Sequence, residues 1–419
     1  MKKLIVIFSY KFPFEPPTEQ FLLEEVKSFM NDDWEIILIP TSRTVDERKA
    51  YFLDDVHCVR AKRYSKYLEV IVGASCLFRK SFWQDVFQSV RKQTGGVLLN
   101  KIRESLYQHW QIAIRVKSFD QIRARIDFSK YKKIVFYSYW LGPMTVAAIR
   151  IARKHFHNNK ITVISRAHGD GDLYLSEKVG DFRPGIKEMS DYGVRVFTIS
   201  DGGKNLLLQQ GLTNVITSRL GVKNNYILTE YSQSNDTFNI VSCSTVNDNK
   251  RVSDIAKSIF LIDNTKIKWT HFGGGERLEY IKKWCNENSK DNIEVNLPGY
   301  VDHEVIMNYY HNNSPDLFIN LSMIEGIPVS IMEAMSFGIP CIATNVGATS
   351  EIVNSCNGFL IDREYEIETI KDLIKSYVEL PDNIKTLYRS EARRTWETKY
   401  NSPKNFESFV RDIDVIINH

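Results

Sequence analysis

Two glutamates separated by seven residues, Glu325 and Glu333, have the chemistry and the setting of a ligand site. Glu325 precedes a Gly–Ile–Pro turn, and Pro328 favours a helix start because its missing N–H is not needed there. The free N–H groups and positive dipole at a helix start favour an anion such as a diphosphate. Glu325 could then reach a group attached beyond the phosphates. Glu333 could accept hydrogen bonds from two adjacent hydroxyls, as on a ribose.

The elements around these glutamates follow from the same stretch. The predicted helix, VSIMEAMSF, stops at Gly338, a natural left-handed cap, and Pro340 prevents its continuation into CIAT, a predicted buried strand. An ordinary loop–helix–strand unit with two exposed glutamates fits the same letters, because Glu pairs at this spacing often arise by chance. The residue types alone leave both interpretations open.

The stretch 324–353 closely resembles the signature of the retaining glycosyltransferases of family 4, which have the GT-B fold. The residues that carry the resemblance are Glu325, Gly326, Pro328, Glu333, Ala334, Gly338, Pro340, Gly347 and Glu351. The resemblance implies an α/β protein of two Rossmann-like domains facing across a cleft, with a C-terminal helix crossing back to the first domain. It is strongest over 240–360, weaker over 1–50 and 160–222, and it breaks down over 60–130.

The order of predicted elements agrees with two such domains. KKLIVIFSY, a helix over 21–30 and WEIILIP open a doubly wound sheet, whose ligands lie beyond the carboxyl ends of its strands. SRLGV, ending near Val222, is predicted as the last strand of the first domain. We therefore predict an acceptor-binding domain over 1–223, a donor-binding domain over 237–399 and a tail helix over 400–419.

The resemblance places the nucleotide-sugar in the second domain. Lys250 matches a lysine that binds the donor diphosphate, although a lysine before a helix is often only solvated. The arginine expected five residues earlier is replaced by Thr245, and the adjacent Arg251 is a candidate substitute. The remaining donor-binding residues implied by the resemblance lie near the nucleobase and at the helix start: Gly299, Tyr300, Val301, Gly326, Ile327, Pro328, Val329 and Glu333.

The first domain contributes a histidine. A histidine in the loop after a strand, such as His168 after ITVISRA, is more often structural than functional. Family 4 members commonly have a histidine here that faces the donor sugar, so the resemblance implies a catalytic His168, with Asp172 holding it or contacting a sugar. The DGD of 170–172 also resembles a metal-binding Asp-x-Asp of the other major glycosyltransferase fold. That fold lacks this chain order, so we expect no metal.

The loop after the first strand departs from the family. Relatives often carry glycines there, close to the donor phosphates, whereas this chain has Pro16 and Pro17. Glu19, which follows, either points at the cleft or is a structural cap. The sequence therefore leaves open any phosphate contact from this loop.

The implied reaction transfers a hexose from a nucleotide-sugar, UDP- or GDP-linked, with retention at the anomeric carbon and without a cofactor. The family is usually described as using front-face displacement, in which the departing diphosphate helps to take the acceptor's proton. The enzyme then works by positioning and by stabilising charge. Glu325 and His168 are the predicted catalytic residues. Two rivals are a nucleotide-sugar epimerase of GT-B fold and a non-enzymatic sugar-nucleotide sensor or membrane adaptor.

Residues 60–133 are helical in pattern and hold 17 basic against 5 acidic residues. The formal net charge of residues 1–220 is consequently +12, whereas that of residues 221–419 is −8. Either these helices pack on the core with solvated basic faces, or they present a basic amphipathic surface to anionic lipid. Because no reader motif accompanies the charge, we expect no nucleic-acid partner. The lipid hypothesis suits a lipid-linked saccharide acceptor, as in bacterial capsule, exopolysaccharide or O-antigen assembly.

The composition is that of a globular protein. The 419 residues are 43% hydrophobic and 25% charged, and no stretch approaches the 18 apolar residues of a membrane span. The apolar run in MKKLIVIFSY is too short for a signal peptide. The six cysteines lack metal-like spacing and are predicted to be reduced thiols. These features predict a cytoplasmic protein, in contact with the inner face of the membrane if the lipid hypothesis holds.

Overall fold

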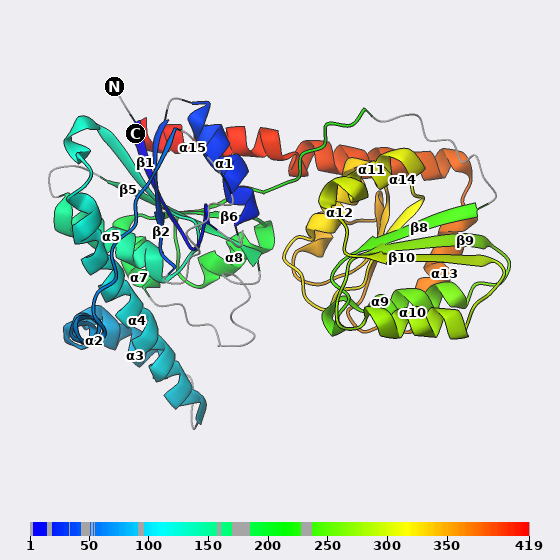
Figure 1. The fold of residues 1–419 in the computed structure, drawn as a ribbon, viewed down its shortest axis with the longest axis horizontal. Helices are drawn as coiled ribbons and strands as arrows, with labels where there is room; N and C mark the ends of the chain where they lie inside the picture. Colours follow the sequence, from blue (N-terminus) through cyan, green and yellow to red (C-terminus); the bar gives the residue numbers. More distant parts are fainter. Residues whose placement is uncertain are drawn as a thin grey trace. The chain divides into compact units, whose positions relative to one another are not determined.

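The chain forms two compact α/β units, each built on one parallel sheet (Figure 1). This computed structural model describes residues 3–14, 19–32, 34–42, 51, 53, 55–90, 96–156, 161–169, 185–227 and 237–418. The N-terminal unit comprises residues 1–218 and 406–419, and the C-terminal unit comprises 219–405. The two-sheet architecture predicted from the sequence is confirmed.

The sheet of the N-terminal unit has seven strands in the order β3-β2-β1-β4-β5-β6-β7. They are β1 (Lys3–Ser9), β2 (Trp34–Pro40), β3 (Val56–Cys58), β4 (Lys133–Ser138), β5 (Thr162–Ala167), β6 (Arg195–Thr198) and β7 (Val215–Thr217). The central strand β1 pairs with β2 and β4, so that Ile5 lies opposite Ile36 and Val135. All three side chains are buried, because helices cover both faces of a parallel sheet.

The helices of this unit include a long insertion between β3 and β4. It consists of α2 (Lys66–Ala74), a 3₁₀ turn (Ser75–Phe78), α3 (Lys80–Val90) and α4 (Gly96–Arg123). The other helices are α1 (Gln20–Met30), α5 (Pro143–His155), α7 (Ile186–Tyr192) and α8 (Asp201–Gln209). The helical pattern predicted for 60–133 is thus confirmed over most of 66–90 and over 96–123.

The last helix, α15 (Ser402–Asn418), starts in the C-terminal unit and ends in the N-terminal one. Figure 1 shows its end (red) beside α1. Phe409 packs edge-on against Phe29 of α1, with ring centroids 5.9 Å apart, and both side chains are buried in one cluster. This contact confirms the predicted return of the C-terminal helix to the first domain.

The C-terminal unit has a six-stranded sheet in the order β10-β9-β8-β11-β12-β13. Its strands are β8 (Thr237–Cys243), β9 (Lys266–Phe272), β10 (Ile293–Gly299), β11 (Leu317–Asn320), β12 (Cys341–Thr344) and β13 (Gly358–Ile361). Its helices are α9 (Val252–Phe260), α10 (Leu278–Glu287), α11 (His303–Asn313), α12 (Val329–Ser336), α13 (Ile367–Val378) and α14 (Asp382–Thr395). The strand order reverses direction at β8, the switch point where ligands of such sheets bind.

Two sequence predictions were wrong in detail. SRLGV is not a strand: the last strand is β7, and from Arg219 the chain belongs to the C-terminal unit, where the Val222 N–H donates to the Tyr400 carbonyl at 3.0 Å. Pro328 is the residue before α12 and not its first helical residue, because its ψ of 118° is extended. Several elements were not predicted, among them β3, β7 and α7.

Candidate functional site

The loop between β8 and α9 brings a cation to one of the two predicted carboxylates. Lys250 ends a 3₁₀ turn, and its N–H donates to Asn247 Oδ1 at 3.1 Å. Its ammonium donates to Glu325 Oε1 at 2.5 Å. The side chains are 23% and 12% exposed, so the pair is shielded but accessible. Lys250 and Glu325 therefore form one charged cluster that faces outward at the switch point of this sheet.

Glycines set the position of the β8–α9 loop. A Cβ on Gly273, whose φ is +139°, would lie 1.9 Å from the Ser244 carbonyl oxygen. The Val246 N–H donates to the Gly274 carbonyl at 2.9 Å, and buried His271 lies 3.1 Å from the same Ser244 oxygen. Because a carbonyl only accepts, His271 Nε2 carries the proton. Gly273 thus serves close backbone packing that no larger residue would permit.

A second glycine positions Glu325. Gly347 has a φ of +56°, and a Cβ there would lie 1.7 Å from the Glu325 carbonyl oxygen. The next residue, Ala348, donates its N–H to the Gly326 carbonyl at 3.0 Å. The loop that follows β12 therefore holds the backbone of the Glu325 turn in place.

The other predicted carboxylate lies inside α12. Glu333 is buried, and its Oε1 lies 2.8 Å from Nε2 of His303, the first residue of α11. This hydrogen bond raises the pKa of His303, whose side chain is 64% exposed. At the N-terminus of α12, none of the described side chains caps the first N–H groups, which leaves them for a ligand.

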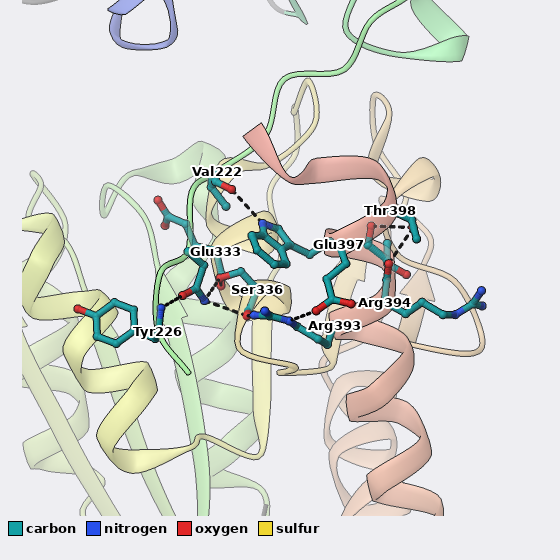
Figure 2. A network of polar contacts seen from close by, with 11 residues as sticks. Val222, Tyr226, Glu333, Ser336, Arg393, Arg394, Glu397 and Thr398 are labelled. Carbon is teal, nitrogen blue, oxygen red and sulfur yellow. Dashed lines mark hydrogen bonds and ion pairs between the residues drawn. The ribbon is translucent and has the colours of Figure 1, made fainter. Parts of the chain in front are cut away.

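The other end of α12 is fixed by a polar network, which Figure 2 shows. The Ser336 hydroxyl donates to the Glu333 carbonyl at 2.7 Å, and Asn224 donates to both the Ser336 carbonyl and its hydroxyl at 2.9 Å. Arg393 of α14 donates to the same carbonyl. These contacts tie the helix that carries Glu333 to the segment entering the unit and to α14.

Glu333 and Lys250 both act on the last side chain of β8, Cys243. Burial and then the charge of Glu333 raise the pKa of the Cys243 thiol to about 12, while Lys250 acts in the opposite direction. Cys243 is the last residue of β8, so Glu333 and Lys250 each lie close enough to affect one side chain. The structure thus brings together the residues predicted for the diphosphate and for the ribose.

The residues predicted around the nucleobase follow β10. Gly299 has a φ of +81° and its carbonyl accepts from the Gly273 N–H at 2.9 Å, which joins this turn to the glycine loop. Tyr300 is 83% exposed, whereas Val301 packs against the core. Of the helix-start residues, Ile327 is buried and Val329 is partly exposed.

Arg251, the candidate substitute for the missing arginine, is committed to backbone carbonyls. Its guanidinium donates to the carbonyls of Leu321 at 2.6 Å and Arg363 at 2.7 Å, and lies 4.6 Å from the Tyr365 ring centroid. The residue has a φ of +46°. In this structure Arg251 joins the ends of β11 and β13 to the β8–α9 loop.

In the N-terminal unit, His168 lies at the end of β5 in an aromatic setting. Its ring centroid is 4.4 Å from that of Tyr139 and 4.6 Å from that of Trp140. Its Nε2 lies 3.1 Å from the Tyr139 carbonyl, so this nitrogen carries the proton and Nδ1 is an acceptor. Burial, reinforced by the positive charge of Arg166, lowers the pKa of His168 to about 3, so the ring is neutral at physiological pH.

Glu19 closes the loop after β1. Its carboxylate accepts from the backbone N–H groups of Tyr10, Lys11 and Phe12 at 2.7, 2.9 and 2.8 Å, and from the Trp140 indole at 2.8 Å. Glu19 is buried. The structure therefore shows a structural role for Glu19. The amide groups that could bind an anion here already donate to its carboxylate.

The comparisons with known proteins concern mainly the C-terminal unit. Residues 229–396 match the family described as "Glycosyl transferases group 1". This stretch belongs to the glycosyl transferases group 1 family. The O-antigen biosynthesis glycosyltransferase WbnH of Escherichia coli is 33% identical over 112 residues, which cover 26% of this chain and 30% of that protein. An E. coli protein named UDP-Gal:alpha-D-GlcNAc-diphosphoundecaprenol alpha-1,3-galactosyltransferase is 31% identical over 107 residues, 25% of this chain and 26% of its own length.

Solved structures resemble the whole chain in fold. The lipopolysaccharide outer core galactosyltransferase WaaB has a TM-score of 0.71 at 14% identity, covering 98% of this chain and 99% of its own. Anabaena HepE in complex with UDP has a TM-score of 0.64 at 14% identity, covering 99% and 100%. These likenesses confirm the GT-B fold.

Sequence reasoning about the candidate site missed one residue, His303. It named Asp172, which lies outside the described residues. His303 contacts Glu333 but lies 30 positions away in the sequence. The one feature that could have indicated it was its position two residues after Val301. Thr245 contributes its carbonyl to the Asn247 N–H at 3.1 Å. The roles assigned to His168, Lys250, Glu325 and Glu333 remain predictions.

Proposed function

We propose that this protein is a retaining, metal-independent glycosyltransferase that moves a hexose from a UDP- or GDP-sugar to a saccharide acceptor in the synthesis of a bacterial O-antigen or related surface polysaccharide. The observation that carries the proposal is the pairing of Lys250 with Glu325 beside the uncapped N-terminus of α12, in a domain of the glycosyl transferases group 1 family. The names of the E. coli relatives support the pathway.

The donor nucleotide would lie along the ends of β8, β10 and β11. Lys250 and the free amide groups of α12 supply positive charge for the diphosphate. Glu333 has one oxygen bonded to His303, and its carboxylate can accept further hydrogen bonds from two adjacent ribose hydroxyls. The exposed ring of Tyr300 and the turn around it would contact the base.

In the transfer step, the acceptor hydroxyl oxygen bonds to the anomeric carbon as the bond from that carbon to the donor diphosphate breaks. The hydroxyl proton passes to an oxygen of the leaving diphosphate. Lys250 stabilises the negative charge that develops on this leaving group, and Glu325 orients the sugar. These two side chains are in contact, so one cluster holds both the cation and the carboxylate.

His168 is proposed as a neutral contact for the donor sugar. Because its pKa is lowered to about 3, it does not supply a proton at physiological pH. Its Nε2 is held on the Tyr139 carbonyl, and Tyr139 and Trp140 fix the plane of the ring.

Thermal-shift screening against a panel of nucleotide-sugars tests the donor, because a ligand that binds only the folded chain raises its Tm. Turnover then separates the rivals. Release of free nucleoside diphosphate only when a saccharide acceptor is present supports transfer. An epimerase would convert the donor without an acceptor, and a sensor would bind it without turnover.

Glu333→Gln tests the ribose contact. Nucleotide affinity should fall by about 1–3 kcal/mol, the scale of lost hydrogen bonds to a charged group. Glu294→Gln, an exposed carboxylate on β10, is the control and should leave affinity unchanged. Equal affinity of Glu333→Gln and the wild type would refute the ribose role.

Contact with anionic membrane is a second part of the proposal. The insertion exposes large apolar side chains on α2, the following 3₁₀ turn, α3 and α4: Tyr67, Val70, Ile71, Leu77, Phe78, Trp83, Phe87, Leu99 and Tyr107. Phe78 is 92% exposed and is followed by Arg79 and Lys80. Exposed bulky residues interleaved with cations suit an anionic lipid surface. Among the described helices, none is long and apolar enough to cross a bilayer.

Vesicle sedimentation tests this contact. Binding to phosphatidylglycerol vesicles should weaken steeply with salt and should fall in Phe78→Ser. Vesicles of phosphatidylcholine alone are the control. Binding that is absent or insensitive to salt would favour the alternative, in which these helices only pack on the core.

A further inference from the structure

The N-terminal unit has a cavity at the carboxyl ends of its central strands. It has a volume of about 340 Å³. The end of β1, the residue after β2, the end of β4 and the start of α5 contribute to its walls, together with Arg115 of α4. Carboxyl ends of strands at the centre of a doubly wound sheet are where such units bind ligands. None of the donor-binding residues discussed above lines this cavity.

A second hollow adjoins the first beneath residues 60–64. The two share Phe8, Thr41, Arg115 and Met144 as lining residues. Among the described residues, four cations line the second hollow with one carboxylate, Glu69: Arg60, Lys62, Arg63 and Arg115. Arg115 also donates to Gln111 Oε1 at 3.2 Å. Among the described residues, the combined site therefore has an apolar floor, formed by Phe8 and Met144, and a positive wall, in which cations outnumber carboxylates.

The segment that supplies the positive wall is fixed on α4. The Lys62 N–H donates to Gln121 Oε1 at 2.9 Å, and the Tyr64 hydroxyl donates to the Lys117 carbonyl at 2.9 Å. Arg125 donates to the Arg60 carbonyl at 3.0 Å. These bonds are made mainly by the backbone of residues 60–64. They fix the segment, and with it the cationic side chains that line the second hollow.

We propose that this site binds a phosphate or diphosphate group of the acceptor, with Arg115 at the junction of the two hollows as its main contact. The inference rests on the proposed function, since it names the acceptor of that reaction. A guanidinium binds phosphate oxygens in a bidentate manner, and neighbouring cations add to the attraction. The apolar floor suits a sugar ring or the start of a lipid chain.

Two observations separate this site from donor binding. The backbone amides after β1, at Tyr10, Lys11 and Phe12, are already bonded to Glu19. The donor diphosphate has its own cation, Lys250, in the other unit. We therefore assign an anion bound at Arg115 to the acceptor. One E. coli relative is named for an acceptor that carries a diphosphate.

The test measures binding of soluble probes to the full-length protein without vesicles. The probes are N-acetylglucosaminyl diphosphate with a short prenyl chain, inorganic phosphate and methyl N-acetylglucosaminide. Arg115→Gln should weaken binding of the glycosyl diphosphate by about tenfold or more, and Arg115→Lys by less. Arg103→Gln removes an equal charge from an exposed position on the same helix and should change binding by less than about twofold.

Each other outcome overturns the proposal or a part of it. Equal losses in Arg115→Gln and Arg103→Gln would mean general charge attraction, as to a lipid surface. Inorganic phosphate binding as tightly as the glycosyl diphosphate would mean a free-phosphate site, and equal binding of the neutral glycoside would remove the role of the anion. If Arg115→Gln does not fold, Lys62→Gln, an exposed position, replaces it with the same expected direction.

Nucleotide binding by the same variants separates this inference from the proposed function. Arg115→Gln should bind the donor nucleotide as the wild type does. If the wild type binds the nucleotide but not the glycosyl diphosphate, only the acceptor inference fails. If it binds no nucleotide-sugar at all, the proposed function fails with it.

Discussion

The loops that follow the first strand of each sheet, after β1 and after β8, occupy equivalent places and are built with opposite charge. After β1, a buried carboxylate, Glu19, fills the position where backbone amides could bind an anion. After β8, the loop presents a lysine whose partner is a shielded but accessible carboxylate. The first loop is closed by its own anion, whereas the second can exchange its partner for a ligand. We therefore propose that the donor diphosphate binds at the loop after β8 and not at the loop after β1.

The largest expected effect concerns the loop after β8, called here the open loop; the loop after β1 is the closed loop. Glu325→Gln keeps the shape of the side chain but removes the charge that orients the sugar, so kcat should fall by about a hundredfold or more. Nucleotide affinity should not weaken, because Lys250 loses a competing anion. Kinetics and nucleotide titration together check both statements. Glu287→Gln, an exposed carboxylate on α10, is the control. A loss of affinity without a loss of kcat would show that Glu325 serves the nucleotide.

A change in the closed loop should lower the free energy of unfolding. Glu19→Ala leaves three backbone N–H groups and the Trp140 indole without their acceptor, which should lower the free energy of unfolding by about 3 kcal/mol. Glu24→Ala on the same helix breaks only a surface pair with Lys27 and should cost less than about 1 kcal/mol. Denaturant unfolding measures both. Similar losses in the two variants would mean that the loop is not held by Glu19.

The histidines of the two units should differ in their titration. His303, raised by its hydrogen bond to Glu333, should titrate above its ordinary pKa near 6.5, whereas buried His168, with a pKa of about 3, should remain neutral from pH 5 to 8. NMR of the imidazole resonances measures both. In Glu333→Gln the pKa of His303 should return towards 6.5. A His168 that titrates near neutrality would contradict its neutral role.

The pKa shifts of His303 and His168 have opposite effects on the stability of the folded chain at low pH. The charged pair of His303 and Glu333 stabilises the folded chain below about pH 6.5, and this contribution is lost as the pH rises through the raised pKa. His168 has a lowered pKa, so the unfolded chain binds the extra proton, and stability falls as the pH drops below about 6.5. The first effect should be small, because His303 is mostly exposed.

The sequence predicted those features that depend on local pattern. Apolar runs such as LIVIF and EIILI predicted β1 and β2, and the Gly–Ile–Pro turn with Gly338 predicted α12 to within one residue. Long-range side-chain contacts have no such signal. The bonds of Glu19 to the preceding loop and of His303 to Glu333 depend on how distant segments meet. SRLGV failed as a strand because an apolar pattern cannot show that the chain is leaving one unit for the other.

The comparison of the two loops is tested most directly by titrating a nucleoside diphosphate, chosen by the thermal-shift panel, into two variants by calorimetry. Lys250→Ala removes the cation of the open loop, and Glu19→Ala removes the anion of the closed one. We expect Lys250→Ala to weaken binding by about tenfold or more and Glu19→Ala to change it by less than about twofold. The reverse order, with Glu19→Ala altering affinity and Lys250→Ala leaving it intact, would contradict the account.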